Sequence, residues 1–518
     1  MNVMELALSY DKGREYTGLF FEDQSFSNKD ISSEARRFAE GLRNIGIKPG
    51  DIVATVLPNC KEILTVYEGV LRCGGVLLPI IFALTEPEIT YMLKDSEAKY
   101  IITSKSLLDK INSTIRRNTK VVVTGMEGMA DQDLIDYRFL VESNQDSEFI
   151  ADRGGDDLAM VMYTSGTTGK PKGVMLTHNN FCASLECPFY DAFNVEGGTV
   201  LITLPMNHVF GLAIWLYSYW KHGATIVLHK WFDPVKALED IERFKISFVP
   251  LVPTMLLMIL DQASKVVYDT SSVRIWFVAA APFPPHKIKD VEERLGGIFI
   301  HDYGLTETMG DLSCQDPDSI RKPGSVGKPM PGMDVRIVDD NGKELPRGQW
   351  GEITVKGWGV MKGYLNRPEE TRDVLRNEFL YTGDIGYLDD DGDLFITDRK
   401  KDMILRGGEN IYPVEVENAF YKMSAIAEVS VFGIPDQKYG EEVVACVVLN
   451  DNQSMTQDEI IAECLKYVPK YKCPKQIAFL KELPKTQTGK FDKKVLRKEA
   501  GRLFSLIASA GGDPPNVK

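Results

Sequence analysis

Metal-binding and disulfide signatures are missing from this sequence of 518 residues. It has only six histidines, and no two of them have the spacing of zinc ligands. Its eight cysteines form no Cys-x-x-Cys pair, so we expect reduced thiols in a cytoplasmic protein without structural zinc. Residues 1–16 carry charges throughout and contain no apolar segment of the kind that directs secretion.

Positive charge is also scarce. The net charge of −14 and the pI near 5.1 argue against general nucleic-acid binding, which needs a basic surface. The segment 466–502 is the exception, because ten lysines and two arginines face three acidic residues there, a local balance of +9. A solvated helix face would explain this, but a basic segment that meets anionic substrates is the interpretation we favour.

Long apolar runs are rare as well. Residues 200–220 contain no charged side chain over 21 positions, which is long enough to span a bilayer. Pro205, Asn207 and Gly211 interrupt the run, so we expect a strand, a turn and a buried helix. We predict no transmembrane segment and leave peripheral membrane contact open. The oligomeric state is expected to be monomer or homodimer.

Short apolar runs alternate with helical patterns along most of the chain. Residues 51–57, 75–80, 98–103 and 120–125 have the composition of buried strands. This alternation predicts an α/β fold with two layers of parallel sheet packed between helices. After about residue 323 the pattern changes to hairpins with an Asp-Asn-Gly turn, and from about residue 402 a smaller α+β unit follows.

The most informative stretch is Tyr163–Gly173, with the sequence YTSGTTGKPKG. Seven of its eleven residues are Gly, Ser or Thr, and it includes Lys170 and Lys172. Glycines let backbone N–H groups turn towards an anion, while hydroxyl and ammonium groups add donors and charge. A flexible linker is the alternative. The spacing differs from a Walker loop, and we expect a strand before the loop and a helix after it.

Four further motifs follow in order: residues 303–308 (YGLTET), 381–386 (YTGDIG), 398–417 (DRKKDMILRGGENIYPVEVE) and 484–490 (PKTQTGK). They supply an aromatic ring, carboxylates and lysines of the kinds that hold adenine, ribose, phosphate and Mg²⁺. Together with the loop, they make the chain similar to the adenylate-forming superfamily. That superfamily includes luciferases and acyl-CoA synthetases, among them 4-coumarate-CoA ligase and the fatty-acyl-CoA synthetases. The resemblance covers nearly the whole chain.

The resemblance implies a role for each matching residue. Tyr303 would stack on adenine, Asp384 and Arg399 would hold the ribose, and Glu307 would bind Mg²⁺. Lys490 would reach the substrate carboxylate and the α-phosphate, with Thr306 contacting that phosphate. The expected catalytic residues are Lys490, Thr306, Glu307 and His208. The expected ATP-binding residues are Thr164, Ser165, Gly166, Thr167, Thr168, Gly169, Lys172, Ala280, Ala281, Pro282, Asp302, Tyr303, Gly304, Thr306, Asp384, Arg399 and Lys490.

The same resemblance implies two domains that move against each other. We expect an AMP-binding domain over residues 1–398, with two α/β layers and a β-rich subdomain. A hinge over 399–401, centred on Lys401, would join it to a small mobile α+β domain over 402–518. Rotation about the hinge would remove Lys490 and bring Gly407, Gly408 and Asn410 to the path of the CoA thiol.

The acyl pocket is expected beside the 303–308 motif and residues 208–210. Its expected residues are His208, Val209, Phe210, Gly304 and Met309. Amino-acid-activating relatives place an Asp at the position of Val209, and a neutral residue cannot stabilise a buried ammonium group. We therefore expect a fatty, alicyclic or aromatic acid, whose identity the sequence leaves open.

The predicted activity is an AMP-forming acid–CoA ligase with ATP, Mg²⁺ and coenzyme A. Its partners would be small molecules: the carboxylic acid, ATP and CoA. Three alternatives stay open at this point: an acyl-acyl-carrier-protein ligase, a luciferase-like oxygenase, and a nucleotide-binding interaction protein without turnover.

Overall fold

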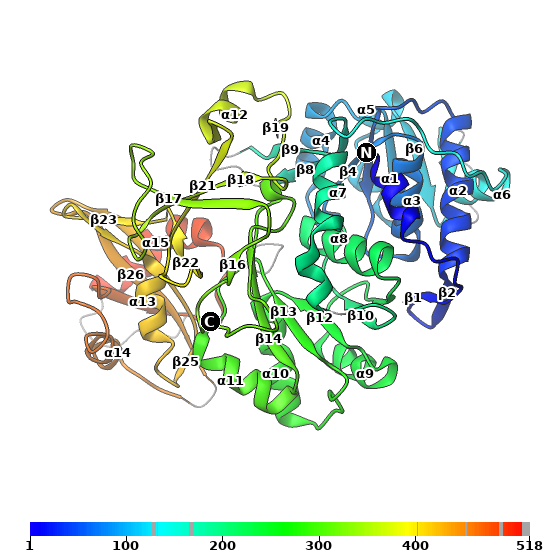
Figure 1. The fold of residues 1–518 in the computed structure, drawn as a ribbon. Coiled ribbons are helices and arrows are strands. Elements are labelled where there is room, and N and C mark those ends of the chain that lie inside the picture. Colours follow the sequence, from blue (N-terminus) through cyan, green and yellow to red (C-terminus); the bar gives the residue numbers. More distant parts are fainter. Residues whose placement is uncertain are drawn as a thin grey trace.

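A computed structural model describes residues 1–126, 131, 133–164, 170–193, 195–400, 402–450, 453–485 and 491–509. The side chains of Asp398, Asn410 and residues 505–509 are outside this description. In the described part of the chain, two large mixed sheets and a smaller one form an N-terminal domain, and a fourth sheet forms a separate C-terminal domain (Figure 1). This arrangement confirms the α/β class expected from the alternating pattern.

The first two sheets are mostly parallel. The nine-stranded sheet has the order β16 (Lys328–Pro329), β15 (Ser313–Cys314), β14 (Ile298–Tyr303), β13 (Ile275–Val278), β12 (Phe248–Leu251), β10 (Thr199–Ile202), β11 (Thr225–Leu228), β1 (Thr17–Phe21) and β2 (Gln24–Ser27). The eight-stranded sheet has the order β19 (Gly363–Tyr364), β9 (Lys172–Thr177), β8 (Leu158–Thr164), β4 (Val76–Pro79), β3 (Ile52–Val56), β5 (Tyr100–Ser104), β6 (Lys120–Thr124) and β7 (Leu134–Asp136). Antiparallel pairs occur only near the edges of these two sheets.

The other two sheets are mainly antiparallel. The third contains β17 (Met333–Val338), β18 (Gly351–Gly357), β21 (Phe379–Leu388), β20 (Leu375–Arg376) and β22 (Leu394–Arg399). The fourth contains β24 (Glu409–Ile411), β23 (Ile404–Arg406), β26 (Gly440–Leu449), β25 (Ile426–Asp436) and β27 (Gln476–Phe479). The predicted Asp-Asn-Gly hairpin joins β17 to β18, where Gly342 takes a φ of 78°.

Helices cover both faces of the two large sheets. The α-helices are α1 (Val3–Ser9), α2 (Asn28–Asn44), α3 (Lys61–Arg72), α4 (Glu86–Asp95), α5 (Ser113–Asn118), α6 (Tyr137–Glu142), α7 (His178–Glu186), α8 (Val209–Trp215), α9 (Pro234–Phe244), α10 (Pro253–Lys265), α11 (Pro285–Leu295), α12 (Pro368–Val374), α13 (Pro413–Phe420), α14 (Gln457–Cys464) and α15 (Lys493–Ser509). The shorter helical turns are η1 (Lys105–Lys110), η2 (Pro188–Phe193), η3 (Leu216–Lys221) and η4 (Thr306–Thr308).

The main core lies between the two large sheets. Phe38 of α2, Tyr67 of α3 and Phe181 of α7 pack there against Leu77 of β4 and Ile226 of β11. The outer faces bury separate clusters, one under α4 and α5 and the other under α9, α10 and α11. Strand residues contribute alternately to the inner and outer clusters, as the two-residue period of a strand requires. This packing fixes the strand ends that carry the sequence motifs.

The uncharged run at residues 200–220 folds as expected into a strand, a turn and a buried helix. β10 precedes the turn, and α8 continues into the π-helical turn η3. Trp215 and Leu216 are buried against the other core helices. Among the residues that the structure describes, no helix is both long and apolar enough to cross a membrane.

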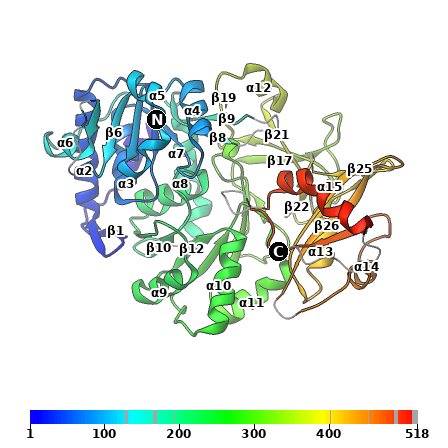
Figure 2. The same ribbon diagram turned by 180° about the vertical axis from the view of Figure 1, so that it is seen from behind.

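The C-terminal domain lies against the third sheet and α11 (Figure 2). Its long hairpin β25–β26 carries α13 and α14 on one face, while α15 covers the other face through Leu496 and Phe504. The ring of Tyr412 stacks on Trp350 with centroids 6.1 Å apart. Arg497 of α15 pairs with Asp402 at 2.8 Å, which ties the last helix to the segment that follows β22.

Candidate functional site

The glycine-rich loop joins two antiparallel strands. β8 ends at Thr164, which pairs with Lys172 at the start of β9. The expectation of a strand, loop and helix was wrong, because residues 172–177 form a strand that pairs with β8 before α7 begins at His178. Thr177 caps that helix instead. The loop residues Ser165, Gly166, Thr167, Thr168 and Gly169 lie outside the described residues.

Lys172 connects the loop to a second motif. Its ammonium group pairs with the Glu370 carboxylate of α12 and lies 5.1 Å from the centre of the Tyr364 ring. Tyr364 belongs to β19, which pairs with β9. The Tyr364 hydroxyl in turn donates a hydrogen bond to Oε1 of Glu307 at 2.9 Å. The two predicted phosphate-site residues therefore both contact one tyrosine, Lys172 at its ring and Glu307 at its hydroxyl.

Glu307 is placed to hold a cation. It lies in η4 beside the buried Thr306, and its backbone carbonyl accepts the Met361 N–H at 2.9 Å. Burial raises the pKa of the Glu307 carboxyl group, while hydrogen bonds from its own backbone and from Tyr364 oppose that rise. The Tyr364 hydroxyl bonds only one of its two carboxylate oxygens, Oε1. Carboxylate oxygens are the ligands that Mg²⁺ prefers, so the residue fits its expected role.

A second cluster gathers the residues expected at the ribose. Asp384 of β21 is 4% exposed and accepts the Tyr303 hydroxyl on Oδ2 at 2.6 Å. Nε of Arg399, on the neighbouring strand β22, lies 3.3 Å from Oδ1 of the same carboxylate. Electrostatic attraction to the Asp384 carboxylate is the main reason that the pKa of the Arg399 guanidinium is raised. Tyr303 and Arg399 therefore hold this carboxylate from two sides.

The segment expected to line the adenine has a strained backbone. Ala280, directly after β13, takes a φ of 75°, in the left-handed region that residues other than glycine rarely adopt. The carbonyl oxygen of Ala281 lies 3.2 Å from Nε2 of His301. Burial lowers the pKa of His301 to about 4, so this ring is neutral at physiological pH. Pro282 follows, and the segment stands beside the end of β14.

Sequence reasoning missed three residues that the structure adds to the site. They are Tyr364, Glu370 and His301, and each holds an expected residue in position. Tyr364 and Glu370 belong to the stretch 360–370, which carries no recognisable motif. His301 is two residues before Tyr303, and a lone histidine in an apolar strand gave no signal of its own.

Asp302 is separated from the nucleotide cluster. Successive side chains of a strand point to opposite faces, so Asp302 faces away from Tyr303. Its buried carboxyl group lies beside Asp311 and the Cys314 thiol, and burial together with Asp311 raises its pKa well above the usual range. The structure thus places this side chain with Asp311, while Tyr303 contacts Asp384.

The residues expected at the acyl pocket surround the start of α8. His208 caps the helix, with Nδ1 accepting the Phe210 N–H at 3.3 Å. Val209 and Met309 are buried, and the Phe210 ring lines an internal cavity together with Gly310. Gly304 differs from this expectation: a Cβ atom added there would lie 1.6 Å from the Gly310 carbonyl oxygen. The glycine is therefore required by a close backbone approach, not by the width of a pocket.

The C-terminal domain carries the residues expected near the thiol. Gly407 and Gly408 form the turn between β23 and β24 with φ angles of 62° and 88°. The Gly407 N–H donates to the Tyr439 carbonyl oxygen at 2.7 Å, which anchors the turn. Lys401, Lys490 and the Asn410 side chain are outside the described residues.

Comparisons with known proteins agree with this geometry. Residues 8–365 match the model of the AMP-binding enzyme family, and residues 415–490 match its C-terminal domain. The chain is 36% identical to a long-chain-fatty-acid–CoA ligase of Bacillus subtilis, over 93% of this chain and 91% of that protein. It is 34% identical to a feruloyl-CoA synthase of an Amycolatopsis species, over 91% and 93%.

A solved structure also resembles the whole chain. The ATP-bound crystal structure of MatB from Rhodopseudomonas palustris has a TM-score of 0.90 at 30% sequence identity. The match covers 96% of this chain and 98% of that one. Both domains are therefore included in the likeness.

Proposed function

This chain belongs to the AMP-binding enzyme family, among its acyl-CoA ligases, and from that membership we propose that it joins a monocarboxylic acid to coenzyme A through an acyl-adenylate. AMP and pyrophosphate are the other products. The observation that carries the proposal is the convergence of two clusters, Tyr303 with Asp384 and Arg399, and Glu307 with Tyr364 and Lys172. A ribose site and a phosphate site at adjoining strand ends fit ATP.

The first step activates the acid. A carboxylate is a poor acyl donor because oxide is a poor leaving group. When a carboxylate oxygen attacks the α-phosphorus of ATP, pyrophosphate leaves and the acyl group is joined to AMP, which is a good leaving group. Asp384 and Tyr303 hold the nucleoside, and Thr306 and Lys172 bind phosphate oxygens on which charge accumulates. Mg²⁺ held by Glu307 would neutralise part of that charge. Lys490 contacts both reacting groups in this proposal, and no protein nucleophile is needed.

The second step transfers the acyl group to the CoA thiol. Lys490 would block the thiol after the first step, so we propose that the domain of residues 402–518 rotates about Lys401 in the 399–401 hinge, relative to residues 1–398. The Gly407–Gly408 turn, with Asn410, then lines the thiol path. Two glycines with positive φ let the backbone come close to a pantetheine chain. Hinge rotation of this kind is common in enzymes that catalyse two steps.

The nature of the acid and the location of the protein are part of the proposal. The cavity beside Phe210 has mostly aromatic walls, which suits a fatty, alicyclic or aromatic group. All eight cysteines are free thiols, in agreement with a reducing compartment such as the cytoplasm. Its partners would be the acid, ATP and CoA.

A panel of acids tests the proposal directly. Purified protein is incubated with ATP, Mg²⁺, CoA and one fatty, alicyclic or aromatic acid, and AMP, pyrophosphate and the thioester are measured. We expect the three products in equal amounts and only with an acid present. Adenylate without thioester from free CoA would favour a carrier-protein ligase instead, and light emission would favour an oxygenase. ATP binding without any product would leave a nucleotide-binding protein and refute the enzyme.

A further inference from the structure

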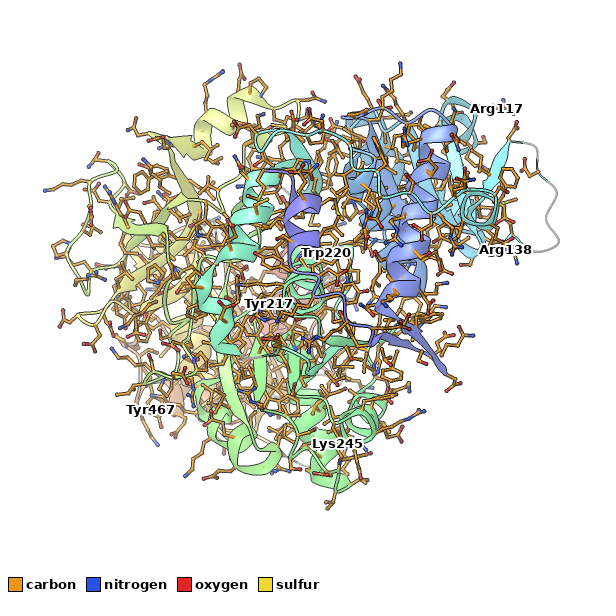
Figure 3. All side chains as sticks on the ribbon, turned by 45° about the vertical axis from the view of Figure 1, so that its right-hand side comes forward. Arg117, Arg138, Tyr217, Trp220, Lys245 and Tyr467 are labelled. Carbon is orange, nitrogen blue, oxygen red and sulfur yellow. The ribbon has the colours of Figure 1, made fainter. Side chains whose placement is uncertain are left out.

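An internal cavity beside the activation site has one polar wall. It is lined by aromatic rings, among them Phe210 of α8 and Phe277 of β13, and on the polar side by Tyr190, Tyr217 and Asp311. Tyr217, labelled in Figure 3, belongs to η3, which continues α8, and its side chain is buried. The free volume is about 10 Å³, which is room for roughly one water molecule. An acyl group can enter only if a wall moves, and Phe210 is half-buried and packs against the core from its edge.

Two hydroxyl groups of this wall lack partners. The Tyr190 and Tyr217 side chains are 6% and 5% exposed, and neither hydroxyl makes a hydrogen bond to any residue that the structure describes. More than nine in ten buried polar groups in proteins are hydrogen-bonded. The Tyr190 hydroxyl, which lies near Asp311, can therefore still bond a polar partner in the cavity.

A buried pair of carboxyl groups lies behind the same wall. Asp311 is 7% exposed and Asp302 is 3% exposed, and Oδ1 of Asp302 has no hydrogen bond to a described residue. Burial raises the pKa of Asp311 to about 6, and the neighbouring Tyr190 hydroxyl opposes the rise without reaching hydrogen-bond geometry. Burial and the repulsion from Asp311 raise the pKa of Asp302 further. The two neighbouring carboxyl groups, buried side by side, therefore offer acceptor oxygens to a hydrogen-bond donor in the cavity.

This acceptor lies close to the residues expected at the acyl pocket. Asp311 follows Glu307 by four residues, and Gly310 packs against Val209 at the start of α8. A carboxylate reacting beside Thr306 would thus extend its other end along Phe210 towards Asp311. A plain hydrocarbon would leave Asp311 and both tyrosines unpaired, and a second carboxylate would be repelled by the pair. A hydroxyl or amino group would donate to Asp311 and meet the tyrosine oxygens.

We propose that the acyl pocket selects acids whose far end carries a hydrogen-bond donor, a hydroxyl or an amino group, and that Asp311 and Tyr190 bind this donor. This proposal rests on the proposed ligase activity. It narrows the substrate class from apolar acids in general to donor-tipped ones, and it disfavours dicarboxylates.

Matched acids test the selectivity of the unmodified protein. Three series share a skeleton and differ at the far end in a methyl, hydroxyl, amino or carboxylate group: benzoates, cinnamates and fatty acids of six to sixteen carbons. We expect kcat/KM for pyrophosphate release to be about 10- to 100-fold higher for the hydroxyl or amino acid than for its methyl partner, the range of one buried hydrogen bond to a charged group. The series with the highest kcat/KM then identifies which class of acid carries the donor: a benzoate, a cinnamate or a fatty acid.

Equal or better use of the methyl acid in every series that is turned over would overturn this inference and leave the ligase activity intact. Absence of pyrophosphate with all acids would instead refute the proposed function on which it rests.

Substitutions test the residues themselves. In Asp311→Leu we expect the hydroxyl-to-methyl ratio of kcat/KM to fall to one or below. Tyr190→Phe should lower the ratio by a smaller factor. Asp318→Leu, at an exposed aspartate between β15 and β16, is the matched control and should keep the ratio.

Folding is checked by thermal unfolding of each variant. If Asp311→Leu does not fold, Asp311→Asn keeps the size of the side chain and removes the charge, and it should lower the ratio by roughly tenfold. A folded Asp311 variant with the ratio of the unmodified protein would overturn the assignment.

Discussion

Replacing Asp384 by Asn changes the proposed ribose site with little change of shape. The carboxylate accepts Tyr303 at 2.6 Å on one oxygen and faces Arg399 at 3.3 Å on the other. Asn keeps one acceptor oxygen but loses the charge. Its NH₂ group would face either the Tyr303 hydroxyl or the Arg399 guanidinium, both of which are donors. The nucleotide would lose its strongest acceptor for the ribose hydroxyl groups.

The expected size follows from the burial of this carboxylate. Asp384 is 4% exposed, so its hydrogen bonds are charge-assisted and little screened by solvent. Losing one such bond costs about 1.5–3 kcal/mol, which weakens ATP binding by roughly 10- to 150-fold. Tyr303 and Arg399 both remain in place to bind other parts of the nucleotide, so binding should be weakened and not abolished.

Calorimetric titration with ATP measures the effect, and Glu352→Gln is the matched control. Glu352 lies on β18 beside β21, where it accepts the Gly383 N–H at 3.2 Å and pairs with Lys400 at 3.1 Å. Its loss breaks an ion pair in the same sheet without touching the Tyr303 cluster. If Asp384→Asn weakens ATP binding no more than Glu352→Gln does, Asp384 stabilises the sheet and does not bind ribose.

Three further predictions concern the cation, the two half-reactions and stability. Glu307→Gln should slow pyrophosphate release at least about 100-fold with little change in ATP affinity, because it removes charge where phosphate charge develops. Tyr364→Phe keeps the carboxylate and should slow pyrophosphate release less than about tenfold. Lys490→Ala should abolish adenylate formation but spare thioester formation from supplied acyl-adenylate, and equal losses in separate assays would exclude this role. The pKa of Asp311 is raised from 3.8 to about 6. At pH values between these two, the native state keeps a proton on Asp311 that the unfolded chain has released. The free energy of unfolding should therefore fall by about 1–3 kcal/mol as the pH rises from about 4 to about 6. Urea melts should show a flatter profile for Asp311→Asn, and an identical slope would contradict the raised pKa.

The glycine at position 304 shows how the structure changes a test. From the sequence, a bulky residue there would be used to fill the acyl pocket. The Gly310 carbonyl oxygen leaves no room even for a Cβ atom, so such a variant would disturb the backbone and report on folding. Asp311 and Tyr190, which line the cavity, are the positions at which pocket chemistry can be changed.

The sequence alone determined the α/β class, most strand positions and the candidate nucleotide residues. Strand periodicity is local, so residues 158–164 and 120–124 were recognisable as strands before any partner was known. The phosphate loop and the motifs around Tyr303 and Asp384 were equally readable, because each one gathers its chemistry within a few residues. The order of these motifs along the chain supported the family resemblance, and with it the predicted activity.

Only the tertiary structure decided which of these groups meet and what supports them. The Tyr303–Asp384 bond joins residues 81 apart, and the Tyr364–Glu307 bond joins residues 57 apart. No local pattern records such a contact, nor whether the loop after β8 returns as a strand. The same holds for Asp302 and Asp311: as letters they are ordinary acids, and only burial beside each other turns them into a charged acceptor behind an apolar cavity, since the energy of a carboxyl group depends on the solvent and partners that the fold leaves it.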